Sequence, residues 1–319
     1  MRDRHFTKIS DWAYGCANFG GLGTPMELLG KGDSEAQAYR NCDQALDLGL
    51  RHFDTANTYA GGESERILGK WLRSIGSHKR EQVIVWTKVG NPTHDGEVGL
   101  RPSHIRKQIE GSLSRLQVDA IDLYYLHIPD PDTPFEESLE CFHSLYLEGK
   151  IKALGASNID HAFLAKACEL SKMNNWISIS CVQMPFNLAR QDLENQFLPT
   201  CQELGIHFFA YSPLEGGLLT GKYSENYIPT GSRVDLRRDL YQKALTPELF
   251  AKLQQCREIA NRYNSNLASL AYLWLADHPL VRGCIVAPRT PQQFEAIELL
   301  RDLHLSPEDR KELNDIWLT

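Results

Sequence analysis

Short runs of consecutive apolar residues alternate along the chain with longer stretches in which apolar residues recur every three or four positions. The run 83–88 begins with four consecutive apolar residues, as in a strand that is buried on both faces of a parallel sheet. The same pattern predicts strands near residues 12–17, 50–54, 121–127, 151–157, 178–183, 206–211 and 282–287. A helical pattern follows each strand. Eight strand–helix units predict a (β/α)₈ TIM barrel with eight parallel strands.

Glycines mark three junctions between a helical pattern and the strand that follows it, at Gly49, Gly149 and Gly205. Glycine adopts the left-handed backbone conformation that commonly ends a helix, so these junctions indicate one repeated architecture. No linker or low-complexity stretch interrupts the 319 residues, and we expect a single barrel domain over residues 1–319. A doubly wound sheet is the alternative, but it requires no particular number of strands.

Polar side chains stand at the carboxyl ends of most predicted strands, which is the face where α/β barrels carry their active sites. Seven of the eight strands end this way, at Asp54, Lys88, His127, Ser157-Asn158, Gln183, Tyr211-Ser212 and, just past the last strand, Arg289. Seven polar ends on one rim are difficult to explain by solvent exposure alone. We therefore expect the functional site there.

Lys88 is informative because an ammonium group at the end of a buried strand needs a partner to offset its desolvation. Asp54, on the neighbouring strand, is the expected counter-ion. Tyr59 lies in the loop that leaves the same strand, and its phenol could reach Lys88. A nearby cation favours phenolate, so we expect Lys88 to lower the pKa of Tyr59 and to make it a general acid that works near neutrality.

These residues stand in motifs that resemble the Asp, Tyr, Lys and His tetrad of the aldo-keto reductase family. The motifs are Asp54-Thr55-Ala56-x-x-Tyr59, Thr87-Lys88-Val89-Gly90, Tyr125-Leu126-His127, Gly155-Ala156-Ser157-Asn158, Cys181-Val182-Gln183 and the run from Tyr211 to Tyr223. The resemblance extends over nearly the whole chain and includes the branch of potassium-channel β subunits. It implies a (β/α)₈ barrel that reduces a carbonyl with a nicotinamide cofactor. It also implies that Tyr59 is the proton donor, Lys88 with Asp54 its modulator, and His127 the group that orients the carbonyl oxygen.

The resemblance also implies cofactor contacts. Ser157, Asn158 and Gln183 match residues that hydrogen-bond the nicotinamide carboxamide, and Tyr211 matches the aromatic residue that stacks on the nicotinamide ring. The pyrophosphate loop corresponds to Ser212, Pro213, Leu214, Gly216 and the residues up to Lys222, and the adenosine end to Lys222, Arg233, Arg289 and Gln293. The cations there suit a 2′-phosphate and favour NADPH, although NAD is not excluded. The chain departs from the family at Ile285-Val286-Ala287, where Ile-Pro-Gly is usual, and at Ile297, where Asn is common.

Composition narrows the possible partners. A formal net charge of −7 disfavours binding to nucleic acid, and no apolar run has the length of a membrane span. The N-terminal residues Met1–His5 have no apolar segment behind their charges, so we expect a cytoplasmic protein. The eight cysteines are widely spaced, which indicates reduced thiols. No motif indicates a metal site, and a monomer is the default expectation.

Other hypotheses remain open from the sequence. A cofactor-sensing auxiliary subunit with little turnover would keep the same motifs, as potassium-channel β subunits do. A lyase that uses Lys88 as a Schiff-base nucleophile is a further alternative, although Asp54 would keep that amine protonated. For the reductase, Asn18, Phe19 and Trp86 are candidates for the mouth of a pocket that is open to small or aromatic carbonyl compounds.

Overall fold

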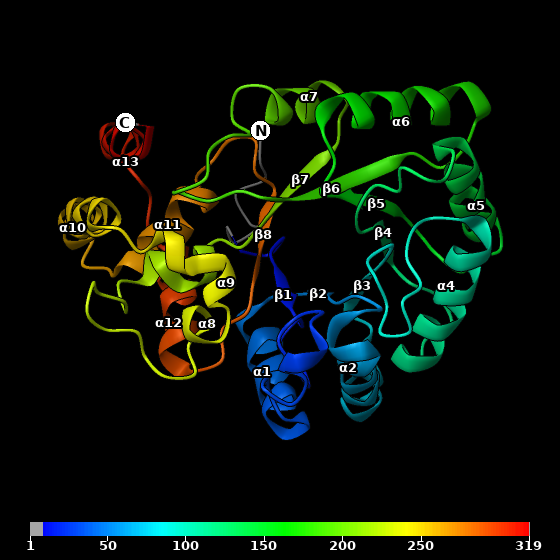
Figure 1. Ribbon diagram of the computed structural model, residues 1–319, viewed down its shortest axis with the longest axis horizontal. Coiled ribbons are helices and arrows are strands. Elements are labelled where there is room, and N and C mark those ends of the chain that lie inside the picture. Colours follow the sequence, from blue (N-terminus) through cyan, green and yellow to red (C-terminus); the bar gives the residue numbers. More distant parts are fainter. Residues whose placement is uncertain (1–8, 319) are drawn as a thin grey trace.

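The computed structural model of the protein describes residues 9–318, and the predicted lack of a secretory signal at Met1–His5 lies outside these residues. The centre of the molecule is a closed barrel of parallel strands in chain order (Figure 1). The strands are β1 Ala13–Gly15, β2 His52–Asp54, β3 Ile84–Val89, β4 Leu123–Leu126, β5 Leu154–Ser157, β6 Ile179–Pro185, β7 His207–Tyr211 and β8 Gly283–Val286. Each strand lies within or close to one of the predicted segments, and the predicted TIM barrel is confirmed.

The barrel closes because β1 pairs with both β2 and β8. Ala13 stands opposite His52 on one side and Ile285 on the other. Parallel pairing places the carboxyl ends of all strands on one rim. The register also puts Lys88 beside Tyr125 and Ser157 beside Gln183, so the predicted polar strand ends are neighbours.

Helices surround the barrel and contact one another in sequence order around most of its circumference (Figure 1). The helices that follow strands β1–β8 are α1 Glu35–Leu48, α2 Glu63–Ser74, α4 Pro102–Leu116, α5 Phe135–Leu147, α6 His161–Asn174, α7 Phe197–Glu203, α11 Leu267–Ala276 and α12 Pro291–Glu298. The additional helices are α3 Gly76–Arg80, α8 Arg233–Leu236, α9 Arg238–Tyr241, α10 Pro247–Arg262 and α13 Pro307–Leu318. Helices α8 and α9 belong to the long connection after β7, whereas α10 and α13 pack together on the outside.

The first barrel helix shows how local sequence fixes these elements. Ser34 caps α1 by accepting a hydrogen bond from the backbone N–H of Gln37, as the capping pattern requires. The helix ends at Gly49, whose φ of 101° lies in the left-handed region that favours glycine.

Two apolar clusters hold the architecture together. The larger one fills the layer between the strands and the helices, and the smaller one lies inside the barrel around Trp86, Tyr125 and Phe209. The rings of Trp86 and Phe209 are 5.0 Å apart and meet edge to face. Asn18, Phe19 and Trp86 were expected at the mouth of a pocket, and that expectation is wrong because all three are buried, at 8%, 0% and 3% exposure.

Two further findings concern the described residues as a whole. The cysteines are all free thiols, and most of them are buried. Over residues 9–318, none of the helices combines the length and the apolar character that crossing a membrane would require.

Candidate active site

Asp54 and Lys88 form a buried ion pair between the ends of β2 and β3. The ammonium of Lys88 donates to Oδ2 of Asp54 at 2.6 Å and to the carbonyl oxygen of Thr55 at 2.8 Å. The other carboxylate oxygen of Asp54 accepts a hydrogen bond from the side-chain amide of Gln183 at 2.9 Å. Both oxygens of the carboxylate therefore have a partner, as a charged group without solvent requires.

Lys88 remains an ammonium ion in this environment. Burial is the largest single influence and lowers the pKa of Lys88, but Asp54 and Tyr59 together outweigh it and raise the pKa. A protonated amine is not a nucleophile, so this arrangement disfavours the Schiff-base chemistry considered above.

Tyr59 lies over this pair in the turn that follows β2. The Nζ of Lys88 is 5.1 Å from the centroid of the Tyr59 ring. Although part of the residue is exposed, desolvation of the phenolate is the largest influence and raises the pKa of Tyr59, while Lys88 offsets this only in part. The expected lowering of this pKa is therefore wrong, and Tyr59 keeps the proton that a general acid needs.

The backbone around Tyr59 is unusual. Ala60, the next residue, has a φ of 49°, a left-handed conformation that costs an L-residue about 1–2 kcal/mol. Its N–H donates to the carbonyl oxygen of Gly23 at 2.8 Å, which ties this turn to the loop after β1. The strained turn thus holds Tyr59 against the rim instead of letting the chain continue as a helix.

His127 completes the group at the end of β4. Its ring meets that of Tyr59 edge to face, with 5.8 Å between the centroids. Burial and, after it, the charge of Lys88 lower the pKa of His127 well below its ordinary value of about 6.5. The imidazole is therefore neutral, and its Nδ1 lies 3.1 Å from the side-chain nitrogen of Asn91.

The residues expected at the nicotinamide form a second network beside His127. Asn158 donates to the carbonyl oxygen of His127 at 2.8 Å and accepts a hydrogen bond from the Tyr211 hydroxyl at 2.7 Å. Ser157 donates to the carbonyl oxygen of Gln183 at 2.7 Å. Gln183 itself is buried, and its side-chain nitrogen is taken by Asp54, so its carboxamide belongs to the ion-pair network as well.

The expected pyrophosphate loop follows β7 and contains several residues in the left-handed backbone region. Ser212, Glu215 and Gly216 all have positive φ, and Asn187 donates to both the Ser212 carbonyl oxygen and the Glu215 carboxylate. A Cβ atom on Gly216 would stand 2.3 Å from the ring of Tyr241 in α9, so this close approach requires glycine. The remaining loop residues named above are the buried Pro213, the half-buried Leu214 and the exposed Lys222.

Cations gather around the expected adenosine end. The guanidinium of Arg233 donates to the side-chain oxygen of Asn18 at 2.8 Å, and within residues 9–318 it makes no salt bridge. Burial, together with Arg237 and Arg289, lowers the pKa of Arg233. A half-buried cation beside two others, with only a neutral partner, is suited to bind an anion.

Arg289 differs from Arg233 because it already has a carboxylate partner. Its guanidinium bonds Oδ1 of Asp33 at 2.6 Å, and the Asp33 side chain is fully enclosed. The backbone N–H of Arg289 donates to the side-chain oxygen of Gln293 at 2.7 Å. Ile297, at the position where the family commonly has Asn, is fully buried and offers no polar atom here.

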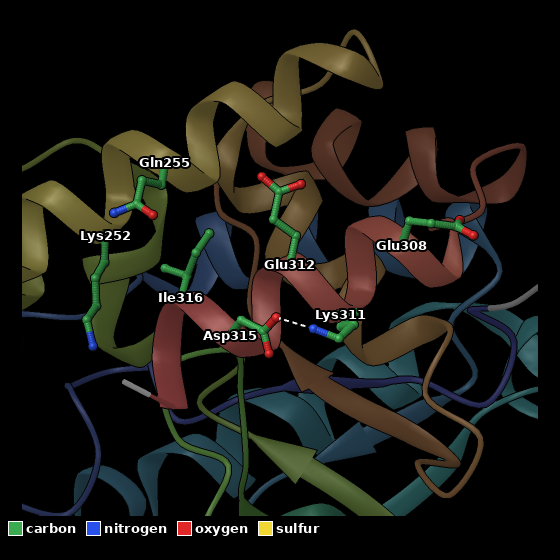
Figure 2. Close-up of a pocket in the computed structure, with 7 residues that line it drawn as sticks. All are labelled: Lys252, Gln255, Glu308, Lys311, Glu312, Asp315 and Ile316. Carbon is green, nitrogen blue, oxygen red and sulfur yellow. Dashed lines mark hydrogen bonds and ion pairs between the residues drawn. The ribbon is translucent and has the colours of Figure 1, made fainter.

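Two surface hollows lie outside this network. One, of about 500 Å³, lies between α10 and α13, and Figure 2 shows that charged side chains surround it. Its lining includes Glu308, Glu312 and Asp315 as well as Lys252 and Lys311, and Lys311 pairs with Asp315. The other, of about 390 Å³, lies beside Tyr59, with Ala60, Gly61, Met26 and Leu29 among its lining residues. Only the second adjoins the residues described above.

Three polar residues of this region were missed in the sequence: Asn91, Asp33 and Tyr241. Asn91 follows Lys88 by three residues, and a search extended from the last strand residue to the next few loop residues would have included it. Asp33 precedes the helix cap Ser34 and had no pattern of its own. Tyr241 stands more than 20 residues beyond Gly216, so only the folded chain brings the two together.

Comparison with known proteins places this site in a family. The model of the aldo/keto reductase family matches residues 13–318. An uncharacterized oxidoreductase, YrpG, of Bacillus subtilis is 35% identical over 300 residues, covering 91% of this chain and 89% of the relative. An NADH-specific methylglyoxal reductase of Escherichia coli is 30% identical over 281 residues, covering 83% of each chain. A putative voltage-gated potassium channel subunit beta of Schizosaccharomyces pombe is 33% identical over 294 residues, covering 87% of this chain and 83% of the relative.

The family model extends over the whole barrel and includes every residue of the buried network. Together with the closed parallel barrel, it confirms the resemblance drawn from the strand-end motifs. The chain belongs to the aldo/keto reductase family, a family of oxidoreductases that use nicotinamide cofactors.

Proposed function

We propose that the protein is an NADPH-dependent aldo-keto reductase that interconverts an aldehyde or ketone and its alcohol, with Tyr59 as the general acid. The observation that carries this proposal is the convergence of Tyr59, the Lys88–Asp54 pair and His127 in one buried network at the strand ends. These groups come from three different strand–loop junctions, and an ion pair needed only for stability would not require a phenol and an imidazole beside it.

The reaction follows from what each group can donate. A reduced nicotinamide, held near Ser157, Asn158 and Tyr211, would supply a hydride to the carbonyl carbon, and the carbonyl oxygen would then take up negative charge and need a proton. Tyr59 passes its phenolic proton to that oxygen, which yields the alcohol and leaves a tyrosinate that takes a new proton from solvent. Lys88, 5.1 Å from the ring centroid, stabilises the tyrosinate while it exists. In the oxidation direction the same transfers run in reverse.

His127 contributes a neutral donor. Because its pKa lies well below 6.5, the imidazole carries one N–H and no charge near neutrality. A donor aimed at the carbonyl oxygen stabilises the negative charge that grows there as hydride arrives, more strongly than it binds the substrate in its ground state. Its backbone is held by Val89 and Asn158, which fixes the ring at the rim.

The cations after β7 and β8 support NADPH over NADH. Arg233 has no carboxylate partner among the described residues, and Arg237 and Arg289 stand close enough to lower its pKa. A cofactor with a 2′-phosphate would relieve this repulsion, whereas NADH brings only the pyrophosphate. We also propose Ser157, Asn158 and Tyr211 as nicotinamide contacts. The name of the Escherichia coli relative makes NADH the control that any test must include.

No second function is proposed. The likeness to a protein named as a potassium channel subunit extends over the same barrel as the other matches. Within the described part of the chain, the groups at the rim serve a carbonyl reaction and require no protein partner. We therefore propose free small carbonyl compounds as substrates, and a cytoplasmic monomer as the working form.

The experiment mixes purified protein with 4-nitrobenzaldehyde and either NADPH or NADH, and follows both nicotinamide absorbance and alcohol formation. We expect one alcohol formed per NADPH consumed and a lower kcat/KM with NADH. Tight NADPH binding without turnover of a panel of aldehydes and ketones would contradict the reductase proposal and favour an auxiliary subunit. Equal use of NADH would contradict the cofactor assignment alone.

A further inference from the structure

The imidazole of His127 can donate to a carbonyl oxygen through only one of its two nitrogens. A neutral imidazole has a single N–H, on either Nδ1 or Nε2, and the hydrogen bond made by one nitrogen decides which of them carries the proton. His127 is only 7% exposed, so solvent has little access to set this choice. What selects the tautomer is therefore a property of the protein around the ring.

Asn91 is the side chain that contacts the ring. Its amide nitrogen lies 3.1 Å from Nδ1 of His127, and over residues 9–318 no other side chain hydrogen-bonds this imidazole. Asn91 follows β3 in the chain, immediately after Gly90, whose φ of 125° turns the backbone. This turn brings Asn91 back towards the end of β4, where His127 stands.

The charged and titratable groups near the ring leave this amide as the deciding partner. Lys88, from β3, is a cation that disfavours the imidazolium and cannot accept a hydrogen bond. Tyr59, after β2, meets the ring edge to face and keeps its proton. From β5, Asn158 contacts only the backbone carbonyl of His127. None of these groups competes with Asn91 at Nδ1.

We propose that Asn91 is a positioning residue that donates its amide N–H to Nδ1 of His127 and thereby holds the imidazole proton on Nε2. The Nε2–H would then be the donor to the substrate carbonyl oxygen. The opposite orientation of the amide would place the proton on Nδ1 and leave a bare nitrogen where the carbonyl oxygen approaches. The assignment of Nε2–H to the substrate rests on the proposed function, but the hydrogen bond itself does not.

The direct test is nitrogen NMR of the cofactor-free protein labelled with ¹⁵N-histidine, where long-range spectra distinguish protonated from unprotonated ring nitrogens. The His127→Asn variant assigns the signal by its loss. We expect wild-type His127 to be the Nε2–H tautomer at neutral pH. In Asn91→Asp the carboxylate can only accept, so the proton should appear on Nδ1. An Nδ1–H tautomer in the wild type, or no change in Asn91→Asp, would overturn the proposal.

His278 serves as an internal reference in the same spectra. Its Nδ1 accepts a hydrogen bond from the backbone N–H of Leu280 at 3.1 Å, and its Nε2 faces the Glu194 carboxylate at 3.0 Å. It should therefore keep a protonated Nε2 in every variant. A change at His278 would report a general disturbance of the fold and not the loss of Asn91.

Kinetics separate a tautomer effect from a packing effect. Asn91→Leu and Asn91→Asp should both lower kcat by about tenfold to a hundredfold near neutral pH, with little change in the KM for NADPH. In Asn91→Asp, acid should restore part of the activity, because the carboxylate beside Nδ1 favours the imidazolium, which again has a proton on Nε2. In Asn91→Leu no carboxylate favours the imidazolium in this buried position, so activity should not recover. Equal losses in the two variants at every pH would assign Asn91 a structural role.

The two assays fail independently. A wild-type protein with the Nε2–H tautomer but without carbonyl reduction would leave the contact intact and would end the proposed function. An active wild-type protein in which His127 is the Nδ1–H tautomer would support the proposed function and would end the proposal for Asn91.

Discussion

Two neighbouring residues of β3 each hold a buried acidic group, on opposite faces of the same strand. Lys88 points into the barrel and binds Asp54 at 2.6 Å, with both side chains almost fully enclosed. Thr87 points outward and donates to Glu65 at 2.6 Å, and Glu65 in turn binds Arg115 at 2.7 Å. Side chains alternate across a strand, so one residue step separates the two networks.

The difference lies in what else each acidic group can reach. Glu65 connects α2 to the strand and to Arg115 of α4, at a point where a Cβ on Gly69 would stand 2.3 Å from the carbonyl oxygen of Arg115. That network stabilises a close helix contact. The Asp54 pair instead adjoins Tyr59, a partly exposed residue in the turn after β2 whose ring lies beside Lys88. Under the proposed function, the Asp54–Lys88 pair differs from the Glu65 network because it acts on the proton of Tyr59.

The largest expected effect comes from a change in the pair of Lys88 and Asp54, which we call the inner pair. Lys88→Met should lower turnover by about 10³-fold, because Tyr59 loses the cation that stabilises its tyrosinate. It should also destabilise the fold by about 3–5 kcal/mol, since Asp54 is left uncompensated. Steady-state kinetics and urea unfolding measure the two effects. The double variant Lys88→Met with Asp54→Asn should recover most of the stability and none of the activity. If the double variant recovered activity, the inner pair would be merely structural.

The network of Thr87, Glu65 and Arg115, which we call the outer network, should affect stability and leave activity unchanged. Glu65→Gln should lower the free energy of unfolding by about 2 kcal/mol, less than for a fully enclosed pair because Arg115 keeps 20% exposure. Activity per folded molecule should stay at the wild-type level, which active-site titration with NADPH would normalise. A loss of turnover as large as that of Lys88→Met would remove the distinction between the two faces.

Arg233 extends the comparison of Lys88 and Arg115, because it is a cation that has no acidic partner among the described residues. Arg233→Met should weaken NADPH binding by about tenfold to a hundredfold, with a smaller effect on NADH and little change in kcat. Arg238→Met is the matched control, because Arg238 is exposed and already pairs with Asp235. Fluorescence titration measures both affinities. Equal losses in the two variants would show that only long-range charge matters.

The smallest expected effect concerns pH. Near neutrality His127 is already neutral and Tyr59 protonated, so reduction should change less than about twofold between pH 7 and 9. Stability should fall as pH drops below about 6.5, because there the unfolded chain protonates His127 while the folded state resists it. His127→Asn should remove part of that loss in thermal unfolding curves. A steep change in wild-type turnover between pH 7 and 9 would contradict a neutral His127 and a protonated Tyr59.

The sequence was sufficient to predict the barrel, because the spacing of apolar residues and the ends of strands are local features of the chain. Lys88 and Asp54 could be paired in advance, since a buried ammonium group needs a counter-ion and adjacent strands supply one. The direction of the Tyr59 pKa could not be predicted, because it depends on whether desolvation or Lys88 dominates, and that requires knowledge of the enclosing atoms.

Hydrogen bonds that depend on where a side chain points could not be predicted from the sequence either. Gln183 was assigned to the cofactor by its resemblance to the family motif, but nothing in the pattern indicates that its amide nitrogen bonds Asp54. Asn91 reaches His127 through a loop whose course depends on the turn at Gly90. Such contacts follow from loop paths, whereas periodicity describes only helices and strands.

The central claim is that Tyr59 donates the proton, and Tyr59→Phe tests it most directly. This variant keeps the ring that lies over Lys88 and removes only the hydroxyl group. We predict that it binds NADPH with an affinity close to that of the wild type and reduces 4-nitrobenzaldehyde at least about a hundredfold more slowly. Wild-type turnover by Tyr59→Phe would contradict the assignment of the acid, and with it the functional meaning given to the inner pair.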